Sequence, residues 1–349
     1  MATLEELGGW RGVLATLTAG RDLSADEAAA AMADIFAGGA SPAQIAAFIV
    51  ALRMKGETLA EMTGLVRAML EVAQPVPLDE ALRSRLVDTC GTGGDRSGTI
   101  NVSTIAAFVV AGAGVPVAKH GNRAASSRAG SADVLEALGV RIDLGPDGVA
   151  RCLAEAGIGF CFAPRFHPAM RHAGPVRREL GVTTVFNFLG PLANPTRPPH
   201  QVVGVSDGRM ALRMAGVLAA NGAIRALVVH GSDGLDELTT TGPSTVVWQE
   251  GGSARTSTVD PAALGLAPAT REQLVGGDAV ANAASLRAVL DAAPGAHRDI
   301  AVLNAAAGLV AAGAAATFEE GVAQAQHLID EGAAAAALER LITVSAACT

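Results

Sequence analysis

Apolar residues recur at helical spacing through the N-terminal part of the chain. After Ser41 they fall at positions 45, 48, 49 and 52, and after Thr58 at positions 59, 62, 65, 66 and 70, so each set lies on one face of a helix. Ser24, Ser41 and Thr58 are each followed three residues later by Glu or Gln, the capping-box pattern that satisfies free N–H groups at a helix start. The pattern predicts a small all-helical domain over residues 1–72, followed by a Pro-containing hinge, Gln74–Pro77.

The pattern changes after Pro77, where short β-branched runs alternate with Ala-rich helical stretches. Such alternation predicts a larger α/β domain over residues 78–349, built on a mostly parallel central sheet. Polar loops at the carboxyl ends of its strands are the expected ligand sites. The predicted strands are Leu86–Thr89, Val115–Lys119, Gly159–Ala163, Gln201–Val205, Ala226–His230 and Thr245–Gln249, and the predicted helices include Ser103–Ala113, Ser131–Leu138 and Arg209–Asn221.

Composition narrows the function classes. Half of the 349 residues are hydrophobic, which excludes intrinsic disorder. The formal net charge is −8 and aromatic residues make up 3%, so neither nucleic acid nor an anionic membrane is an expected partner. The charge-free stretch from Ile300 to Phe318 is rich in Ala and Gly, which predicts a buried helix and not a membrane span. The four cysteines form no CxxC pair, which favours reduced thiols in a cytoplasmic protein.

A glycine-rich turn directly follows the first predicted strand. Gly91, Gly93 and Gly94 allow the backbone to turn sharply and to bring N–H groups close to a ligand. Ser103 or Thr104 is expected to cap the next helix, whose N-terminus favours an anion. The segment therefore predicts a phosphate cradle. The alternative is a tight strand–helix turn with no ligand, and the segment is neither a Walker loop nor a GxGxxG fingerprint.

Two stretches reverse the sign of the overall charge. Residues 96–132 contain four Lys or Arg residues and no acid, and residues 156–178 contain four Arg, two His and no acid. In an acidic chain, two such windows favour two anionic ligand groups. The alternative, that these cations pair with acids elsewhere in the fold, is weaker for the first window and equally good for the second.

An acidic pair follows a later strand. Asp236 and Glu237 lie in a Gly-rich loop where other loops gather phosphate-binding groups. Mg²⁺ takes one or two carboxylates and completes its shell with water and phosphate oxygens. The pair therefore predicts a magnesium site, against the alternative of a solvated loop.

Six motifs, in order along nearly the whole chain, resemble the anthranilate phosphoribosyltransferase family. The motifs are GTGGD (91–95), NVST (101–104), KHGNR (119–123), GSADVLEALG (130–139), VRRELG with VFNFLGPLANP (176–195) and HGSDGLDE (230–237). The resemblance implies transfer of the phosphoribosyl group from phosphoribosyl pyrophosphate to the amine of anthranilate, the second step of tryptophan biosynthesis from chorismate. It also implies a helical domain that includes residues from about 165–185, an active site at the hinge, and a homodimer formed through the helical domain.

The resemblance further implies residue roles. Magnesium, as one or two ions, would be held by Ser103, Asp236 and Glu237, and anthranilate would be met by Gly91, Asn122 and Arg177. Arg96 departs from the family, in which many members have a small residue. The residues implied for the sugar donor are Gly91, Gly94, Asp95, Thr99, Asn101, Val102, Ser103, Thr104, Lys119, His120, Gly121, Asn122, Arg123, Ala124, Ala125, Ser126, Ser127 and Ser131.

The reaction itself asks for little acid–base chemistry. The sugar is expected to pass through an oxocarbenium-like state, and the aryl amine is neutral at pH 7 with a free lone pair. We therefore assign no general acid or base. For His120 we expect a structural or substrate-packing role, with help in removing the amine proton as the alternative, and for His167 a packing or rim position. Two rival functions fit less well: a pyrimidine nucleoside phosphorylase, which has no use for a magnesium–pyrophosphate site, and a diverged relative that binds nucleic acid.

Overall fold

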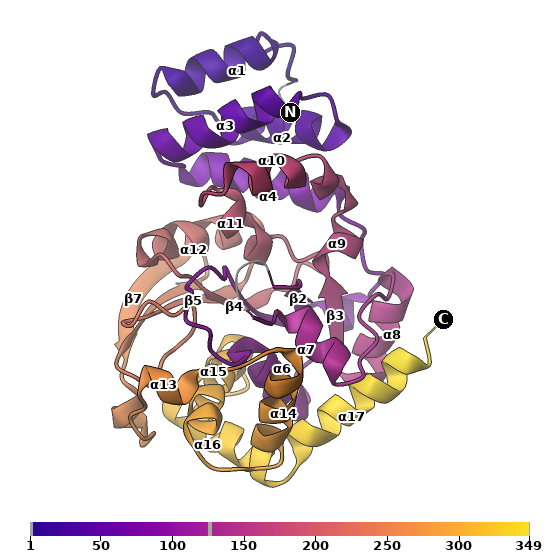
Figure 1. Ribbon diagram of the computed structural model, residues 1–349, viewed down its shortest axis with the longest axis vertical. Coiled ribbons are helices and arrows are strands. Elements are labelled where there is room, and N and C mark those ends of the chain that lie inside the picture. Colours follow the sequence, from indigo (N-terminus) through magenta and orange to yellow (C-terminus); the bar gives the residue numbers. More distant parts are fainter. Residues whose placement is uncertain (1–2, 125–127, 349) are drawn as a thin grey trace.

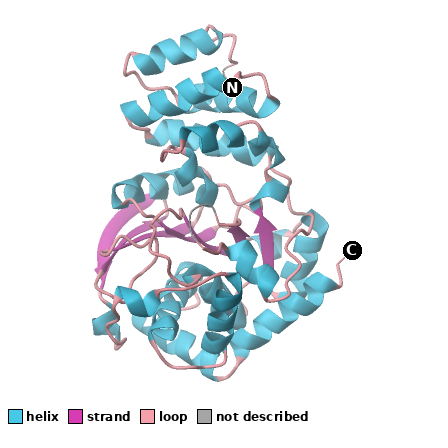
Figure 2. Cartoon of the chain, in the orientation of Figure 1, coloured by secondary structure: helices cyan, strands magenta, loops and turns pink. Residues whose placement is uncertain are grey.

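The computed structural model describes residues 3–124 and 128–348. A stack of helices stands on a larger body built around one twisted sheet (Figure 1). Figure 2 shows that every strand lies in the larger body and that helices cover both faces of the sheet. This is the predicted fold class, a small helical domain joined to a larger α/β domain.

The helical stack begins with four N-terminal helices. These are α1 (Gly9–Thr18), α2 (Ala25–Ala37), α3 (Pro42–Lys55) and α4 (Leu59–Val72). The three predicted capping boxes are confirmed: the hydroxyls of Ser24, Ser41 and Thr58 each accept from the N–H three residues on, and the returning Glu or Gln accepts from the cap N–H. A much later helix, α10 (Gly174–Leu180), packs against α3 in the same stack (Figure 1).

The sheet of the larger body has seven strands, in the order β3-β2-β1-β4-β5-β6-β7. The first five in this order are parallel, and β6 and β7 are antiparallel additions. All six predicted strands are present. The bounds are β1 (Val87–Gly91), β2 (Val117–Gly121), β3 (Ile158–Phe162), β4 (His200–Gly204), β5 (Arg225–Gly231), β6 (Ser244–Glu250) and β7 (Ser253–Val259).

The strand order reverses beside β1. The chain runs outward through β2 to β3 and then returns to place β4 on the other side of β1. The carboxyl ends of β1 and β4 therefore lie at the switch point of the sheet. Open α/β sheets bind their ligands at such a switch point.

Helices of the larger body bury their apolar faces on the sheet. The predicted buried helix is confirmed as the middle of α15 (Ala296–Ala312), where residues 300–311 are all buried. No helix in the described residues is both long and apolar enough to cross a bilayer. The other helices are α5 (Glu80–Arg83), α6 (Val102–Gly112), α7 (Ser131–Ala137), α8 (Pro146–Ala156), α9 (Ala163–Phe166), α11 (Phe186–Leu189), α12 (Ala211–Ala220), α13 (Arg271–Leu274), α14 (Ala279–Leu290), α16 (Phe318–Asp330) and α17 (Ala333–Ala346).

Apolar packing continues from the helical stack to one face of the sheet. Buried side chains of α2, α3 and α4 form one cluster with residues 185–193, with α12 and with strand residues such as Val203 and Val228. A second cluster fills the opposite face, around α6, α15 and α17. The break in sequence pattern at Gln74–Pro77 therefore does not separate two independent cores.

Two local expectations were wrong. Strand β7 was not predicted, because its exposed edge carries the polar sequence SARTSTV and only Val259 is buried. Neither Ser103 nor Thr104 caps α6. That helix begins at Val102, with Asn101 as a cap residue whose side chain makes no capping hydrogen bond to the helix. Instead, the Glu237 carboxylate of a distant loop accepts from an N–H group in the first turn of α6.

Candidate active site

Four parallel strands end in glycine at the same edge of the sheet, at positions 91, 121, 204 and 231. The loop after β5 crosses the ends of β1 and β4 in close contact. A Cβ atom at Gly204 would lie 1.5 Å from the backbone oxygen of Asp236, and one at Gly91 would lie 2.4 Å from the Asp236 carboxylate. Glycine is required at both positions because this approach leaves no room for a side chain. The approach brings the acidic pair onto the glycine-rich turn.

Hydrogen bonds hold the acidic pair in place. The Gly93 N–H donates to Oδ2 of Asp236 (2.6 Å), and the Ser103 N–H donates to Oε1 of Glu237 (3.1 Å) across 134 residues of sequence. Glu237 thus satisfies one of the free N–H groups in the first turn of α6, where a negative charge is favoured. The glycine-rich turn, the start of α6 and the acidic pair meet at one point.

The acidic pair lies where two negative charges are disfavoured. Burial, with Asp95 nearby, raises the pKa of Asp236 to about 7. Burial and the neighbouring Asp236 raise the pKa of Glu237 well above its usual value. Both shifts disfavour the ionised forms, so a cation at this point would be strongly attracted.

Lys119 supplies a buried positive charge to the same point. Its side chain is only 3% exposed, and its ammonium donates to the Thr89 carbonyl (2.6 Å) and to the Ser103 hydroxyl (3.2 Å). Burial lowers the pKa of Lys119, and the negative charges of Asp88 and Glu237 oppose that shift. The ammonium is therefore held by its neighbours at the start of α6, where it can reach an anion bound at the turn.

Asp88 and Asn194 form a support that the sequence analysis missed. Asp88 is fully buried and accepts from the His120 N–H (3.1 Å) and from the Asn194 side-chain amide (2.9 Å). Asn194 also donates to the Ala118 carbonyl (2.7 Å). Asn194 lies inside one of the family motifs, so its position could have flagged it, whereas Asp88 lies within an apolar strand pattern that gave no signal.

His120 and His167 form a buried pair of neutral rings. Their centroids lie 5.3 Å apart, and the Nε2 atom of each has no hydrogen-bond partner among the described residues. Burial lowers the pKa of His120 to about 3, with the nearby His167 as a second cause, and burial lowers the pKa of His167 to about 4. Both rings are therefore uncharged at neutral pH.

The buried pair predicts a loss of stability in weak acid. An unfolded His167 binds a proton near pH 6.5, while the folded one does so only near pH 4, so acidification between these values favours unfolding. The free energy of unfolding should fall between pH 7.5 and pH 5, and we expect the substitution H167N to make this fall smaller by about 2 kcal/mol. Urea unfolding at the two pH values measures this difference. The matched substitution H327N, at an exposed position of α16, should leave it unchanged, and an equal difference in wild type and H167N would contradict the buried neutral ring.

Arg177 is a partly buried cation that lacks a counter-ion in the described part of the chain. Its guanidinium lies over the Phe186 ring, 5.1 Å from the centroid, and no ion pair with another described residue involves it. Burial lowers the pKa of Arg177. A partly desolvated guanidinium beside a ring suits a planar carboxylate.

Arg123, in contrast, has its partners within the protein. Its guanidinium, 47% exposed, pairs with Asp133 and Glu136 of α7 at 2.9 and 2.8 Å. Asp133 also accepts from the N–H groups of Ala124 and Gly130, so it fastens both flanks of the loop after β2. The structure therefore confirms the alternative for Arg123, namely that this cation pairs with acids elsewhere in the fold. Ala125, Ser126 and Ser127 lie outside the described residues.

A second set of contacts shapes the loop before α6. Asn101 donates to the Ala129 carbonyl and accepts from Asn282 at the start of α14, and Thr99 pairs with Val275 as an isolated bridge. No local pattern around Val275 or Asn282 indicated this contact, because it joins segments far apart in the sequence. Of the other predicted residues, three lie in loops at this edge, namely Gly94, Asp95 and Asn122. The remaining four lie at the ends of flanking elements: Gly121 ends β2, Val102 and Thr104 are in the first turn of α6, and Ser131 begins α7.

A pocket of about 130 Å³ adjoins the glycine-rich turn. Two arginines, Arg96 and Arg271, line it together with Asp95, Ser97 and Thr99 of the turn. Arg96 takes a positive φ of 57°, a conformation that costs a non-glycine residue free energy. Arg96 thus places an additional cation at this pocket.

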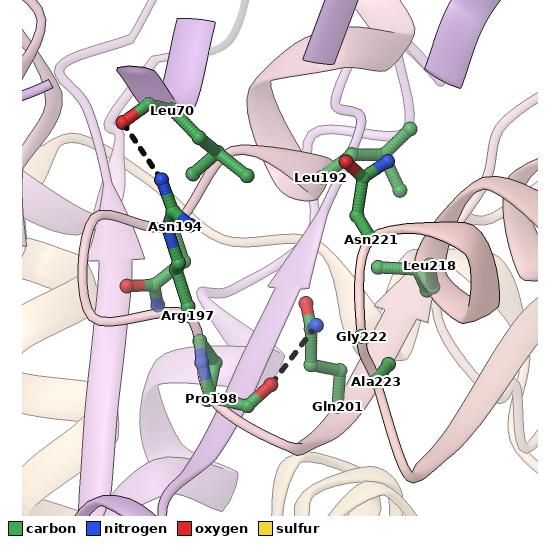
Figure 3. A pocket seen from close by; sticks show the side chains of 10 residues that line it. All are labelled: Leu70, Leu192, Asn194, Arg197, Pro198, Gln201, Leu218, Asn221, Gly222 and Ala223. Carbon is green, nitrogen blue, oxygen red and sulfur yellow. Dashed lines mark hydrogen bonds between the residues drawn. The ribbon is translucent and has the colours of Figure 1, made fainter. Parts of the chain in front are cut away.

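A smaller pocket, about 20 Å³ in volume, lies where the helical stack meets the sheet (Figure 3). In Figure 3 the Arg197 side chain reaches the end of α4 and donates to the Leu70 carbonyl (3.2 Å). A space of this size holds about one water molecule and no substrate. Its contacts join the two parts of the chain without forming a ligand site.

The residues at the acidic pair fit a magnesium ion that shares its shell with a ligand. Among the described residues no group of three or more His, Cys, Asp or Glu side chains could form a protein-only metal site. Mg²⁺ does not need one, because it binds through one or two carboxylates and takes its remaining ligands from water and phosphate. The two crowded carboxylates and the Ser103 hydroxyl are oxygen donors of the required kind.

Comparison with known proteins gives consistent matches to both parts of the chain. A family model described as "Glycosyl transferase family, helical bundle domain" matches residues 11–73, and one described as "Glycosyl transferase family, a/b domain" matches residues 83–335. The anthranilate phosphoribosyltransferase of Roseiflexus castenholzii is 57% identical over 328 residues, which cover 93% of this chain and 95% of that protein.

Two solved structures show the same architecture. The anthranilate phosphoribosyltransferase (TrpD) from Thermus thermophilus matches with a TM-score of 0.90 and 44% identity, over 96% of this chain and 99% of that one. The Saccharomyces cerevisiae enzyme, solved in complex with PRPP and Mg, matches with a TM-score of 0.87 and 26% identity, over 97% and 98% of the two chains.

Proposed function

Because this chain belongs to the anthranilate phosphoribosyltransferase family, we propose that it transfers the 5-phosphoribosyl group of phosphoribosyl pyrophosphate to the amine of anthranilate and releases pyrophosphate. This reaction is the second step of tryptophan biosynthesis from chorismate. One observation carries the proposal: the glycine-rich turn, the start of α6, Lys119 and the acidic pair converge at the switch point of the sheet. Family membership decides against the two rival functions.

The sugar donor would bind across the ends of β1 and β2. N–H groups of the glycine-rich turn and of the first turn of α6 favour phosphate oxygens, and the buried ammonium of Lys119 adds a fixed positive charge. The flanks of the loop after β2, held by Asp133, would present further N–H groups. The guanidinium of Arg123 would act by holding this loop to α7 and not by touching the donor.

Ser103, Asp236 and Glu237 would hold one or two magnesium ions. The support for this assignment is the crowding of the two carboxylates, whose pKa values are raised by burial and, secondly, by neighbouring carboxylates. When bound, Mg²⁺ would neutralise the negative charge that collects on the departing pyrophosphate. The Gly93 and Ser103 N–H groups orient the carboxylates for this task.

Anthranilate would bind with its carboxylate at Arg177 and its ring beside Gly91 and Asn122. The planar guanidinium can accept a carboxylate in bidentate geometry, and the unpaired state of Arg177 among the described residues supports its availability. The amine would then face the sugar carbon across the end of β1.

The chemistry needs positioning more than proton transfer. The C1–O bond to pyrophosphate breaks, the C1–N bond to anthranilate forms, and the nitrogen then loses a proton. The neutral His120 and His167 rings would pack near the acceptor without adding positive charge. Bringing the two substrates together in the correct orientation accounts for most of the expected rate enhancement.

We also propose a division of the chain that follows its packing. Residues 1–72, together with about 165–185, would act as one helical unit, and residues 78–349 as the catalytic unit. The contact of α10 with α3 supports the inclusion of the later segment, and this segment carries Arg177. The family resemblance supports a homodimer formed through the helical unit.

Loss of anthranilate fluorescence tests the proposed function. The purified full chain, mixed with anthranilate, phosphoribosyl pyrophosphate and Mg²⁺, should consume anthranilate and release one pyrophosphate for each molecule consumed. Omission of the sugar donor, or addition of a chelator, serves as the control. Stable fluorescence together with phosphorolysis of a pyrimidine nucleoside would refute the proposal in favour of the first rival.

A further inference from the structure

Two cysteine thiols lie side by side at the edge of the larger body, far from each other in the sequence. Cys152 is on α8, and Cys348 follows the last turn of α17, which packs against α8 (Figure 1). The two side chains are 1% and 4% exposed. The Cys348 sulfur lies 3.8 Å from the carbonyl of Gly148, which is one helical turn before Cys152 and on the same face of α8.

Polar contacts fix the segment that carries Cys348. Arg141 donates from its side chain to the Cys348 carbonyl (2.6 Å) and from its backbone to the Ser345 hydroxyl (3.2 Å). Arg151, the neighbour of Cys152 on α8, donates to the Ala347 carbonyl (3.1 Å). The closeness of the two sulfurs therefore follows from a network that joins α8 to the end of α17.

The other two cysteines provide an internal contrast. Cys90 on β1 and Cys161 on β3 are both buried and free, but strand β2 lies between their strands. Neighbouring strands are about 4.8 Å apart, so these two residues are separated by more than the roughly 7 Å that a disulfide can bridge. Of the four cysteines, Cys152 and Cys348 are thus the two placed for bond formation.

We propose that Cys152 and Cys348 are a redox-active pair that low-molecular-weight disulfides, such as oxidised glutathione, convert into a disulfide linking α8 to the end of α17. The Cys348 sulfur attacks the small disulfide, forms a mixed disulfide and releases one thiol. The Cys152 sulfur then attacks the Cys348 sulfur and expels the second thiol. Both cysteines lose a proton, and one small disulfide is reduced to two thiols for each protein disulfide formed.

The surroundings set the order of attack and its pH dependence. Burial, with Cys348 nearby, raises the pKa of Cys152 to about 12, although Arg151 opposes the shift. A protonated thiol is a poor nucleophile, so Cys152 takes the second step, in which the mixed disulfide is held against it. Exchange should therefore be slow at neutral pH and faster at pH 8.5.

The disulfide would stabilise the larger body without entering the candidate active site. It would close a loop of roughly 200 residues, and cross-links of this kind act mainly by restricting the unfolded chain. Neither cysteine belongs to the loops at the carboxyl ends of β1, β2 and β5. The oxidised protein should unfold a few degrees higher and keep its catalytic rate within about twofold.

Equilibration in a glutathione redox buffer tests the pair. The full chain is brought to equilibrium at pH 8.5 from both the reduced and the oxidised side, quenched with acid, alkylated, digested and analysed by mass spectrometry. We expect a cross-linked peptide joining Cys152 to Cys348, and an equilibrium constant for its formation about 100-fold higher in the folded protein than in denaturant. The variant C152A or C348A should lose this peptide, and the matched buried variant C161A should keep it.

The same experiment can overturn the proposal. Equal equilibrium constants in the folded and denatured chain would show that the fold does not bring the sulfurs into bonding geometry. Detection of protein–glutathione mixed disulfides without the Cys152–Cys348 cross-link would lead to the same conclusion. Both outcomes are read from the wild-type protein, so they hold even where a variant fails to fold. They are also independent of the proposed transferase activity, which does not use either thiol.

Discussion

The double substitution D236N/E237Q is expected to lower phosphoribosyl transfer by at least about a thousandfold, which corresponds to about 4 kcal/mol of transition-state stabilisation. The two carboxylates lie where the glycine-rich turn meets the start of α6, and the departing pyrophosphate would collect its charge at this point. Amides of the same shape cannot hold Mg²⁺ in the same way, so the charge on the leaving group would remain uncompensated.

The fold should tolerate this change. Amide oxygens can still accept from the Gly93 and Ser103 N–H groups, and the substitution removes two carboxylates whose pKa values are raised by burial and by neighbouring acids. The unfolding temperature should therefore stay equal or rise. Rates from anthranilate fluorescence, measured with Mg²⁺ in excess, and a thermal unfolding curve provide the two measurements.

A matched acidic pair serves as the control. Glu319 and Glu320 are adjacent and exposed in the first turn of α16, so E319Q/E320Q removes the same charge without touching the sheet edge and should leave the rate unchanged. If D236N/E237Q keeps a native unfolding curve and near wild-type activity, the acidic pair does not hold the metal.

Local sequence patterns predicted part of the fold and the position of the acidic pair. The capping boxes and the alternation of strands and helices are local signals, and they predicted three helix starts and six strands. The meeting of the turn at 91–95 with residues 236–237 was also predictable, because parallel strands end at one edge of the sheet. Strand β7 was not predicted, because this exposed edge strand has no apolar alternation.

Interactions that join distant segments could not be predicted in the same way. Glu237, and not Ser103 or Thr104, caps α6 from 134 residues away. Asp88 holds the His120 backbone through a buried carboxylate that looks like any strand residue in sequence, and Asn282 fixes the loop at Asn101 from the start of α14. Each contact depends on three-dimensional proximity that no nearby residue encodes.

Arg177 is the expected partner of the anthranilate carboxylate. Its guanidinium is partly buried against Phe186, and burial lowers its pKa, so the residue carries a desolvation cost that no described carboxylate offsets. A bound carboxylate would supply the missing partner. We therefore expect R177A to raise KM for anthranilate by roughly 100-fold, as loss of a desolvated charge partner typically costs about 2–5 kcal/mol, and to change KM for the sugar donor by less than about threefold.

The neighbouring residue allows a matched control for this prediction. Arg178 belongs to the same helix, α10, but is exposed, so R178A removes the same charge from the stack and should leave both KM values near wild type. R177K keeps the charge without the planar fork and should fall between wild type and R177A. Steady-state kinetics with each substrate varied in turn measures these values. Equal increases in both KM values for R177A would mean that Arg177 supports the architecture of the cleft, and anthranilate would then need another cation.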